Sequence, residues 1–384
     1  MEQAAYQIKD EIIELRRNFH QIPELSFCEF KTTELICAYL DKYNISYQMI
    51  DKTGVVATIS GQKPGKTILL RADIDALPIQ EKNKLSYASK HDGCMHACGH
   101  DVHIACLLGA ARILSEAEFS GAVKLVFQPG EETDGGALPM IEKGVLENPT
   151  VDAAFALHVE PLADVGTIQI RDGAIMASPD EFTMTVYGKG GHGSAPHQCV
   201  DPIAISAEII RAFHAITRTA VHPMKPCVVS VCSVHAGNCP NVIPEIATME
   251  GTVRSLDHET RKTIAKALQK TAESIACSMG GHCDFEFRAL YPPTINTPEM
   301  NQIVVEAVKK ISKIQKIETL EFSSMAGDDF AYFAERVPAA YFRLGVGNAQ
   351  HHAPIHSPDF YVDEDSIPLG VAILAQTAID YLKN

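Results

Sequence analysis

The chain has 384 residues, 46% of them hydrophobic, which is more than one compact core usually absorbs. Its formal net charge of −15 disfavours nucleic acids and anionic membranes as partners. There is no signal-peptide pattern and no apolar run of about eighteen residues, and the eleven cysteines lack the spacing of a disulfide framework. We therefore expect a cytoplasmic protein with two structural units.

Helix and strand patterns alternate over the first 160 residues or so. In chain order they predict helices over 4–18 and 31–42, and strands over 55–60, 67–70, 123–127 and 153–157. Such alternation predicts a sheet covered by helices. Gln128 and His158 directly follow two of these strands, and sites in α/β proteins lie at the carboxyl ends of strands.

The pattern changes after residue 178. Its order is strand, helix, two strands, helix and strand, over 182–187, 202–217, 227–234, 246–254, 258–278 and 283–288. This βαββαβ order is typical of a ferredoxin-like unit, and prolines at positions 179, 292 and 293 bound it. We expect 179–291 to be an insertion in a domain formed by 1–178 and 292–384, which helices over 301–311 and 366–382 and a strand over 339–344 complete.

Two segments in the first domain concentrate polar side chains after a predicted strand. RADIDALPI contains Asp73 and Asp75, and buried carboxylates are costly unless they are paired, hydrogen-bonded or near a cation. HDGCMHACGHDVH contains four histidines, two cysteines and two aspartates. Cys98 and His100, two apart on a glycine-containing loop, can bind one cation, and Asp101 or Asp73 can orient the imidazole. The alternative is a surface histidine cluster with an incidental cysteine.

Further candidates follow in QPGEETDGG, FALHVE and HHAPIHSPDF. The adjacent Glu131 and Glu132 point in different directions, so one can bind metal while the other faces the substrate water. Acidic pairs in loops are usually only solvated, and a lone histidine such as His158 is more often a core residue. Together with the CGHD cluster and with His356 near the C-terminus, however, they are typical of a metal site.

The predicted insertion carries its own candidates. Glycines flank His192 in GKGGHGSAPH and permit a close backbone approach on both sides. Asn241 begins the segment NVIP, and Arg254 is a charged residue at the end of an otherwise apolar strand. These residues can reach a substrate if the inserted domain closes as a lid.

In their order along the chain, RADIDALPI, HACGHD, the double glutamate, GKGGHGSAPH, NVIP and HSPDF resemble the aminoacylase and carboxypeptidase-like metallohydrolases. The likeness is to their amidohydrolase branch, which includes hippurate hydrolase, N-acetyldiaminopimelate deacetylase and the IAA-amino acid hydrolases. It runs from near Arg16 to the C-terminal HSPDF. It implies an α/β fold, with a zinc-exopeptidase-like catalytic domain and an inserted ferredoxin-like lid that also forms a homodimer.

The resemblance also assigns roles. It implies two divalent metal ions per subunit, ligated by Cys98, His100, Glu132, His158 and His356. Glu131 would be the general base, and His192, Asn241 and Arg254 would contact the substrate, with His192 reaching the site of the partner subunit. Mixed sulfur, nitrogen and oxygen ligands suit zinc, manganese, cobalt or nickel.

Two positions depart from the family pattern. Arg71 stands where the wider family often has a first metal-binding histidine, so Asp73 would orient a ligand and not begin the metal site. Asp328 stands where relatives commonly have glutamate, and the shorter carboxylate would move the wall of the site or change the metal preference.

The expected reaction converts a small N-acyl amino acid, with an acetyl, benzoyl or similar group, into a carboxylate and a free amino acid. A metal lowers the pKa of its bound water from about 15.7 towards about 7, and Glu131 takes the proton and returns it to the leaving amine. His192 would help to stabilise the oxyanion, and Arg254 and Asn241 would hold the α-carboxylate. The alternatives are a dipeptidase or carboxypeptidase of the same family, a metal-independent hydrolase using Cys98 and His100, and a non-enzymatic metal-binding dimer.

Overall fold

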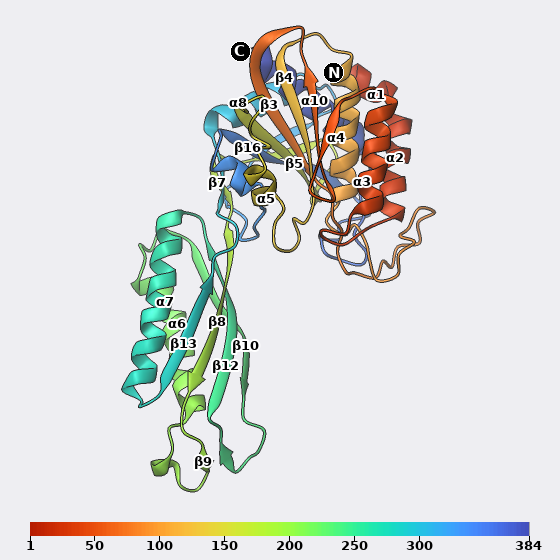
Figure 1. Cartoon of the computed structure of the whole chain (residues 1–384). Coiled ribbons are helices and arrows are strands. Elements are labelled where there is room, and N and C mark those ends of the chain that lie inside the picture. Colours follow the sequence, from red (N-terminus) through yellow and green to blue (C-terminus); the bar gives the residue numbers. More distant parts are fainter. Residues whose placement is uncertain (384) are drawn as a thin grey trace. The chain divides into compact units, whose positions relative to one another are not determined.

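The computed structural model describes residues 1–383, and these form two compact units, labelled by element in Figure 1. The first unit contains Met1–Ile175, Ile295–Phe322 and the chain from Asp329 onward. The second contains Met176–Thr294 and Ser323–Asp328. The segment Ser323–Asp328 belongs to the second unit because the backbone nitrogen of Ala177 donates to the backbone oxygens of Ser324 and Ala326. No strand pattern in the sequence predicted this pairing.

A mixed eight-stranded sheet forms the centre of the first unit, in the order β1-β2-β4-β3-β5-β16-β6-β15. Its strands are β1 (Tyr47–Ile50), β2 (Gly54–Ser60), β3 (Lys63–Asp73), β4 (Ser120–Gln128), β5 (Ala153–Asp164), β6 (Thr167–Ile170), β15 (Lys316–Thr319) and β16 (Ala339–Gly347). The neighbouring strands β4, β3, β5 and β16 run parallel. Their carboxyl ends therefore lie at one edge of the sheet.

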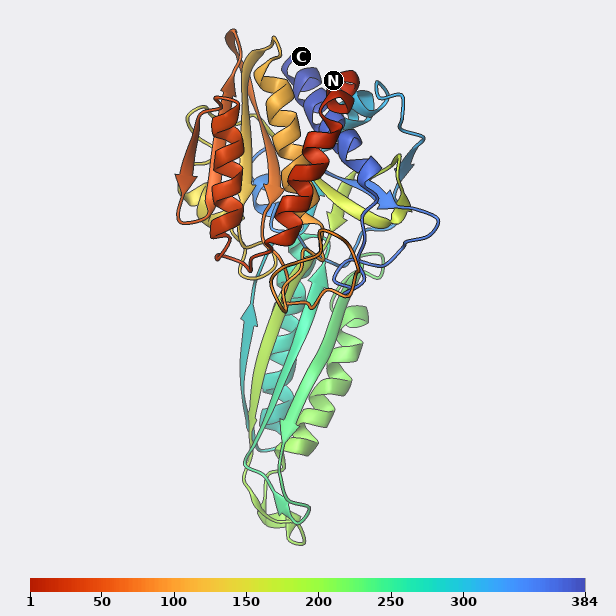
Figure 2. The same ribbon diagram turned by 90° about the vertical axis from the view of Figure 1, so that its right-hand side faces the viewer.

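Helices cover this sheet. They are α1 (Glu2–Gln7), α2 (Lys9–Gln21), α3 (Phe30–Lys42), α4 (His100–Ser115), α5 (Ala137–Glu142), α8 (Pro298–Val308), α9 (Ala331–Ala334) and α10 (Ile367–Lys383). Helices α4 and α10 pack against each other and against β3 and form the middle of the core. Because α1 contacts α10, the two ends of the chain lie close together in this unit (Figure 2). None of the described helices combines the length and hydropathy that a membrane crossing requires.

The sequence pattern failed at two places that matter for the site. It predicted a loop around His100, but His100 is the first residue of α4, which was not predicted. Nearly every residue of α4 is buried, and a helix that is apolar all round lacks the polar face that produces amphipathic periodicity. The pattern also ended a strand before His158, whereas β5 continues past it to Asp164.

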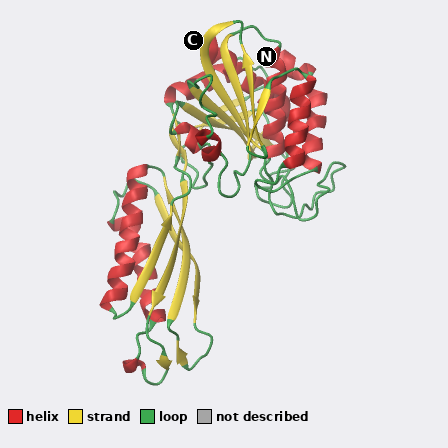
Figure 3. Ribbon diagram, in the orientation of Figure 1, coloured by secondary structure: helices red, strands yellow, loops and turns green. Residues whose placement is uncertain are grey.

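The second unit has the βαββαβ order expected of a ferredoxin-like fold. Its elements are β8 (Ser178–Tyr187), α6 (Pro202–Thr219), β10 (Cys227–Ala236), β12 (Ile246–Ser255), α7 (His258–Ser278) and β13 (His282–Arg288). The strands are antiparallel in the order β10-β12-β8-β13, and both helices cover the same face of the sheet (Figure 3). Asp201 and Asp257 cap the N-termini of the two helices, which explains where each begins.

Short elements complete the topology. In the second unit, β9 (Gly191–His192) pairs with β11 (Val242–Ile243), just after the chain leaves β8 and just before it enters β12. A further two-stranded sheet joins β7 (Gly173–Met176) to β14 (Thr294–Asn296). The 3-10 helices η1 (Pro196–Gln198) and η2 (Glu364–Ser366) lie in loops.

Candidate active site

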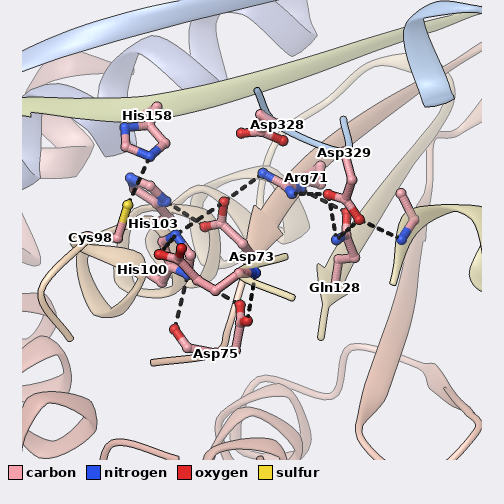
Figure 4. A network of polar contacts seen from close by, with 12 residues as sticks. Arg71, Asp73, Asp75, Cys98, His100, His103, Gln128, His158, Asp328 and Asp329 are labelled. Atoms are coloured by element: carbon pink, nitrogen blue, oxygen red, sulfur yellow. Dashed lines mark hydrogen bonds and ion pairs between the residues drawn. The ribbon is translucent and has the colours of Figure 1, made fainter. Parts of the chain in front are cut away.

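The carboxyl ends of β3 and β4 carry a buried polar network (Figure 4). Arg71 donates to Asp73 at 2.6 Å, to Gln128 at 2.9 Å and to Asp329 at 2.8 Å. Gln128 also donates to both carboxylate oxygens of Asp329. The guanidinium neutralises carboxylates that would be costly to bury alone.

Asp73 orients His103, a residue that was not among the candidates from the sequence. The backbone nitrogen of Val159 donates to Nε2 of His103 at 3.0 Å, so Nδ1 carries the proton and donates to Asp73. Burial favours the neutral acid, but Arg71 and His100 outweigh it and hold the pKa of Asp73 well below its usual range. Asp73 is therefore an anionic anchor. Its Oδ2 lies 3.6 Å from Nε2 of His100, the imidazole that it was expected to orient.

Two histidines direct Nε2 into the same space. Nδ1 of His100 donates to the backbone oxygen of Asp75 at 2.9 Å, and Nδ1 of His158 donates to the backbone oxygen of Val159 at 2.7 Å. Nε2 of His158 lies 3.5 Å from Sγ of Cys98. A carbonyl acceptor on one ring nitrogen is the usual device that orients a metal-binding imidazole.

The remaining candidate metal ligands, Glu132 and His356, lie on loops. Nε2 of His356 lies 3.4 Å from Oε1 of Glu132, and Nε2 of His100 lies 3.8 Å from the same atom. His356 adopts a left-handed backbone conformation with φ of 62°, and its nitrogen donates to the backbone oxygen of Ala97 at 2.8 Å. This bond ties the C-terminal loop to the segment that bears Cys98.

The five predicted ligands form two groups that share one thiol. Cys98, His100 and His158 make one group, and Cys98, Glu132 and His356 make the other; within each, the possible ligand atoms lie within 4.8 Å of one another. A further group of the same size brings Glu131 to His100 and Glu132. The structure thus gathers residues from four separate segments of the first unit.

Electrostatics around these groups favours a bound cation. Burial, followed by the charges of Glu132 and Glu131, raises the pKa of the Cys98 thiol well above its usual value. Burial opposes protonation of His100, but Asp73 and Asp75 outweigh it and raise its pKa to about 10. Burial holds the pKa of His158 well below its usual value, so this imidazole is neutral. The cluster has an excess of negative charge, which a metal ion would compensate.

Asp101, the other expected orienter of His100, faces different partners. Its Oδ2 accepts from Nδ1 of His20 at 2.8 Å and lies 2.7 Å from Nε of Arg16. Despite its burial, these two cations hold the pKa of Asp101 below its usual range. The expectation that Asp101 orients His100 was therefore wrong. Asp101 lies in the first turn of α4, and its carboxylate contacts residues of α2 instead.

The residue that holds His100 is instead Asp75, which the sequence marked as a costly buried carboxylate without a defined role. The available signal was the pair of aspartates at alternate positions where β3 ends. Alternate residues of an extended chain point to the same side, but the sequence did not reveal which of the two would meet His100.

The candidate substrate-binding residues of the second unit lie at two separate positions within it. His192 lies on β9 opposite Val242, and the backbone oxygen of Asn241 accepts from Gly193 at 2.8 Å, so His192 and Asn241 are neighbours. Arg254 lies near the end of β12, between Val228 and Pro179. Asp328 is buried in the segment that joins this unit. The structure therefore brings His192 and Asn241 together and separates them from Arg254.

A mixed sheet with thiol, imidazole and carboxylate side chains gathered near the ends of its parallel strands is the arrangement of a metal-dependent hydrolase. Comparison with known proteins agrees. The chain belongs to peptidase family M20/M25/M40, whose model matches residues 69–380. It is thus a hydrolase of amide bonds, in the amidohydrolase branch that its motifs indicated.

Named relatives cover nearly the whole chain. Thermostable carboxypeptidase 1 of Saccharolobus solfataricus is 41% identical, with 98% of this chain and 96% of that protein aligned. N-acetylcysteine deacetylase of Bacillus subtilis is 38% identical over 97% of both chains. Among solved structures, a dinuclear metal-binding M20 peptidase from Bacillus subtilis is 36% identical, covers 98% of this chain and 99% of its own, and superposes with a TM-score of 0.87.

Proposed function

We propose that this protein hydrolyses small N-acyl amino acids to a carboxylate and a free amino acid, at a site that holds two divalent cations. The observation that carries the proposal is the convergence of Cys98, His100, Glu132, His158 and His356 beside the carboxylate of Glu131. The deacetylase relative and the dinuclear relative support it, the first in substrate class and the second in metal number.

The donor set fits such cations. Nε2 of His100 and Oε1 of Glu132 are buried and have no hydrogen-bond partner among the described residues. Buried polar atoms without a partner are rare in native proteins because each costs free energy, and a cation between these two atoms would satisfy both. Cations bound there would lower the pKa of the attacking water and polarise the substrate carbonyl. Thiol, imidazole and carboxylate ligands together suit zinc, manganese, cobalt or nickel.

Glu131 supplies the proton transfers in this proposal. The residue is 9% exposed, so the carboxylate works in a largely water-excluded place. It takes a proton from the attacking water and later delivers it to the nitrogen of the leaving amino acid. The carboxylate of Glu132 lies against His100 and His356. In this proposal Glu132 therefore binds metal, and Glu131 carries out the proton transfers.

His192 is suited to donate a hydrogen bond to the oxyanion. The backbone nitrogen of Ser194 donates to Nδ1 of His192 at 3.1 Å, so Nδ1 is an acceptor and the proton of the neutral ring is on Nε2. The side chain is exposed and its Nε2–H is available to a ligand. A donor aimed at a developing oxyanion contributes about 3 kcal/mol to transition-state stabilisation.

The positions of Arg254 and His192 support a shared active site. Arg254 is eight residues along β12 from Ile246, the first residue of that strand after β11. At about 3.3 Å per residue this separates it from the His192 end by roughly 26 Å, which is longer than a small N-acyl amino acid. If both contact one substrate, they come from different subunits. The same holds for Arg254 and Asn241, so we propose that the second unit acts as both lid and homodimer interface.

The alternatives differ in how well the observations support them. The carboxypeptidase relative is a specific reason to retain peptide cleavage as a second candidate activity. A metal-independent cysteine hydrolase is less well supported, because a catalytic cysteine needs a lowered thiol pKa, whereas burial raises that of Cys98. We further propose a cytoplasmic location, which the eleven cysteines support because all are free thiols.

A substrate panel tests the proposal. Protein treated with a chelator and then reconstituted with each metal is assayed against N-acetyl, N-benzoyl and longer N-acyl amino acids, with dipeptides and N-blocked peptides alongside. We expect the highest kcat/KM for an N-acyl amino acid and full loss of activity on chelation. Full activity after metal removal would contradict the two-cation proposal, and a preference for peptides would favour the second candidate.

A further inference from the structure

Glu29 is a buried carboxylate that the mechanism above does not use. It is 0% exposed and precedes α3 directly. Its Oε1 accepts a hydrogen bond from the backbone nitrogen of Phe27 at 2.8 Å and another from that of Gly130 at 3.0 Å. One oxygen atom therefore joins two segments that lie about a hundred residues apart in the sequence.

Both residues held by this oxygen have unusual backbones. Phe27 has φ of 61° and Gly130 has φ of 70°, so both lie in the left-handed region that favours glycine. The ring of Phe27 lies on Gly130 so closely that a Cβ added to the glycine would meet it at 2.4 Å. The turn at Gly130 leads directly into Glu131 and Glu132, and it depends on this close approach.

The segment that contains Phe27 and Glu29 also contacts Asp75, which holds the backbone at Glu132. The hydroxyl of Ser26 donates to Oδ2 of Asp75 at 2.7 Å, and the same oxygen accepts from the backbone nitrogen of Glu132 at 3.0 Å. The backbone is thus held on both sides of Glu131, at Gly130 by Glu29 and at Glu132 by Asp75.

Holding Glu29 in this place has a cost. Burial raises its pKa to about 7, so a proton is bound more tightly in the folded chain than in the unfolded chain. A raised carboxyl pKa reduces folding stability as the pH rises from the unfolded pKa towards the folded one. A carboxylate that costs stability but holds an active-site turn is better explained by function than by folding.

We propose that Glu29 is a positioning residue, which sets the carboxylates of Glu131 and Glu132 through its hydrogen bond to Gly130. The inference rests on the proposed function of Glu131. It predicts that loss of the bond lets the turn relax, moves the general base and lowers kcat more than it changes KM. A displacement of about 1 Å at a reacting group costs up to about a hundredfold in rate.

Substitutions that separate geometry from charge test the proposal. Glu29→Gln keeps an acceptor oxygen in place, and we expect it to retain kcat within about threefold. Glu29→Asp keeps the charge but is one methylene too short to reach Gly130, and Glu29→Ala removes the group; we expect both to lower kcat between about tenfold and a hundredfold.

Glu24 provides a matched control. It lies in the same segment and its carboxylate accepts from the backbone and the hydroxyl of Thr32 in α3, with no hydrogen bond to the turn at Gly130. Glu24→Ala should therefore cost stability and leave kcat close to that of the unaltered enzyme. Amide hydrogen exchange gives a readout independent of activity: exchange at Gly130 should rise in Glu29→Asp and Glu29→Ala, and not in Glu24→Ala.

A double-mutant cycle links Glu29 to Glu131. If Glu29 acts through Glu131, then Glu29→Ala should cost about threefold or less in kcat when Glu131 is already glutamine. Unchanged kcat and exchange in both Glu29→Asp and Glu29→Ala, or fully additive losses in the cycle, would overturn the role of Glu29. Normal activity of Glu131→Gln alone would instead overturn the proposed function, so the two failures are distinguishable.

Discussion

The backbone nitrogen of Glu132 donates a hydrogen bond to Oδ2 of Asp75 at 3.0 Å. Asp75 also holds His100, whose Nδ1 donates to its backbone oxygen at 2.9 Å and lies 3.3 Å from Oδ1 of its side chain. One residue therefore orients two candidate metal ligands that come from different segments of the chain. Its contribution to metal binding should be large, although Asp75 itself is absent from the five predicted ligands.

Asp75→Ala keeps the backbone oxygen but removes the carboxylate that contacts both His100 and Glu132. It should lower metal affinity between about tenfold and a hundredfold, which is typical when a group that orients metal ligands is lost. The measurement is metal content at buffered free metal, followed by kcat on the saturated enzyme. Ser26→Ala is the control, because it removes one hydrogen bond to the same carboxylate and leaves both ligand contacts intact. Equal metal affinities for the two variants would show that Asp75 does not orient the ligands.

Glu131→Gln should leave metal content unchanged and lower turnover by at least about a hundredfold, because an amide of similar shape cannot accept the proton. Both quantities should be measured on the same preparation. Near-normal turnover at full metal occupancy would remove Glu131 from the proton transfers.

Cys98→Ser should weaken metal binding far more than Cys106→Ser. Cys98 belongs to both groups of candidate ligands, whereas the thiol of Cys106 is buried in the core and contacts the backbone oxygen of Ile367. A hydroxyl is a poor replacement for a thiolate ligand. Elemental analysis at low free metal decides the question: a full metal complement in Cys98→Ser would show that this thiol is not an important ligand.

Gly99→Ala and Gly93→Ala form a matched pair. Both glycines have positive φ, 81° and 72°, so alanine pays a left-handed backbone cost of about 1 kcal/mol at each. Only at Gly99 does the added Cβ meet a neighbour, Cγ2 of Val159 at 2.5 Å. Thermal or chemical unfolding should show a clearly larger loss of stability for Gly99→Ala, with a fall in metal content. Equal losses of stability in the two variants would show that the side chain of Val159 can move to accommodate the added Cβ.

Mixing two inactive variants tests the shared active site. Dimers with Glu131→Gln and dimers with His192→Ala are combined after dissociation and reassociation. Random pairing makes about half of the dimers mixed, and one site in each mixed dimer has both residues intact, so about a quarter of all sites should recover. Mixed dimers confirmed by mass spectrometry but no more active than their parents would rule out a contribution of His192 from the partner subunit.

Much of the fold was predictable because hydrophobic periodicity recorded it. Helix α7 occupies His258–Ser278 as predicted, and the strands that begin at Ala153, Cys227 and Ala339 start at the predicted residues. Helix α4 was missed because it is buried on all sides, so its sequence lacks the alternation of apolar and polar residues that marks an amphipathic helix. The first helix was predicted as one and is two, since the chain leaves helical geometry at Ile8.

The site was predictable in its residue types but not in its supporting contacts. Cys98 and His100 could be recognised because their neighbours in the sequence are also polar and lie after a strand. His103 and Asp75 are held by hydrogen bonds to distant segments of the chain, and no local sequence pattern records such bonds. The error over Asp101 has the same origin, because its partners Arg16 and His20 come from α2.

The two groups of candidate ligands rest on supports of different rigidity. His158 lies inside β5, which is bonded to β3 and β16 on its two sides, and His100 begins a buried helix. His356 and Glu132 come from loops, and the side chain of His356 is 50% exposed. Cations in the two groups should therefore exchange with solvent at unequal rates, and dilution into a weak chelator would release the loop-bound ion first. A singly loaded enzyme would then be an observable intermediate in metal loss.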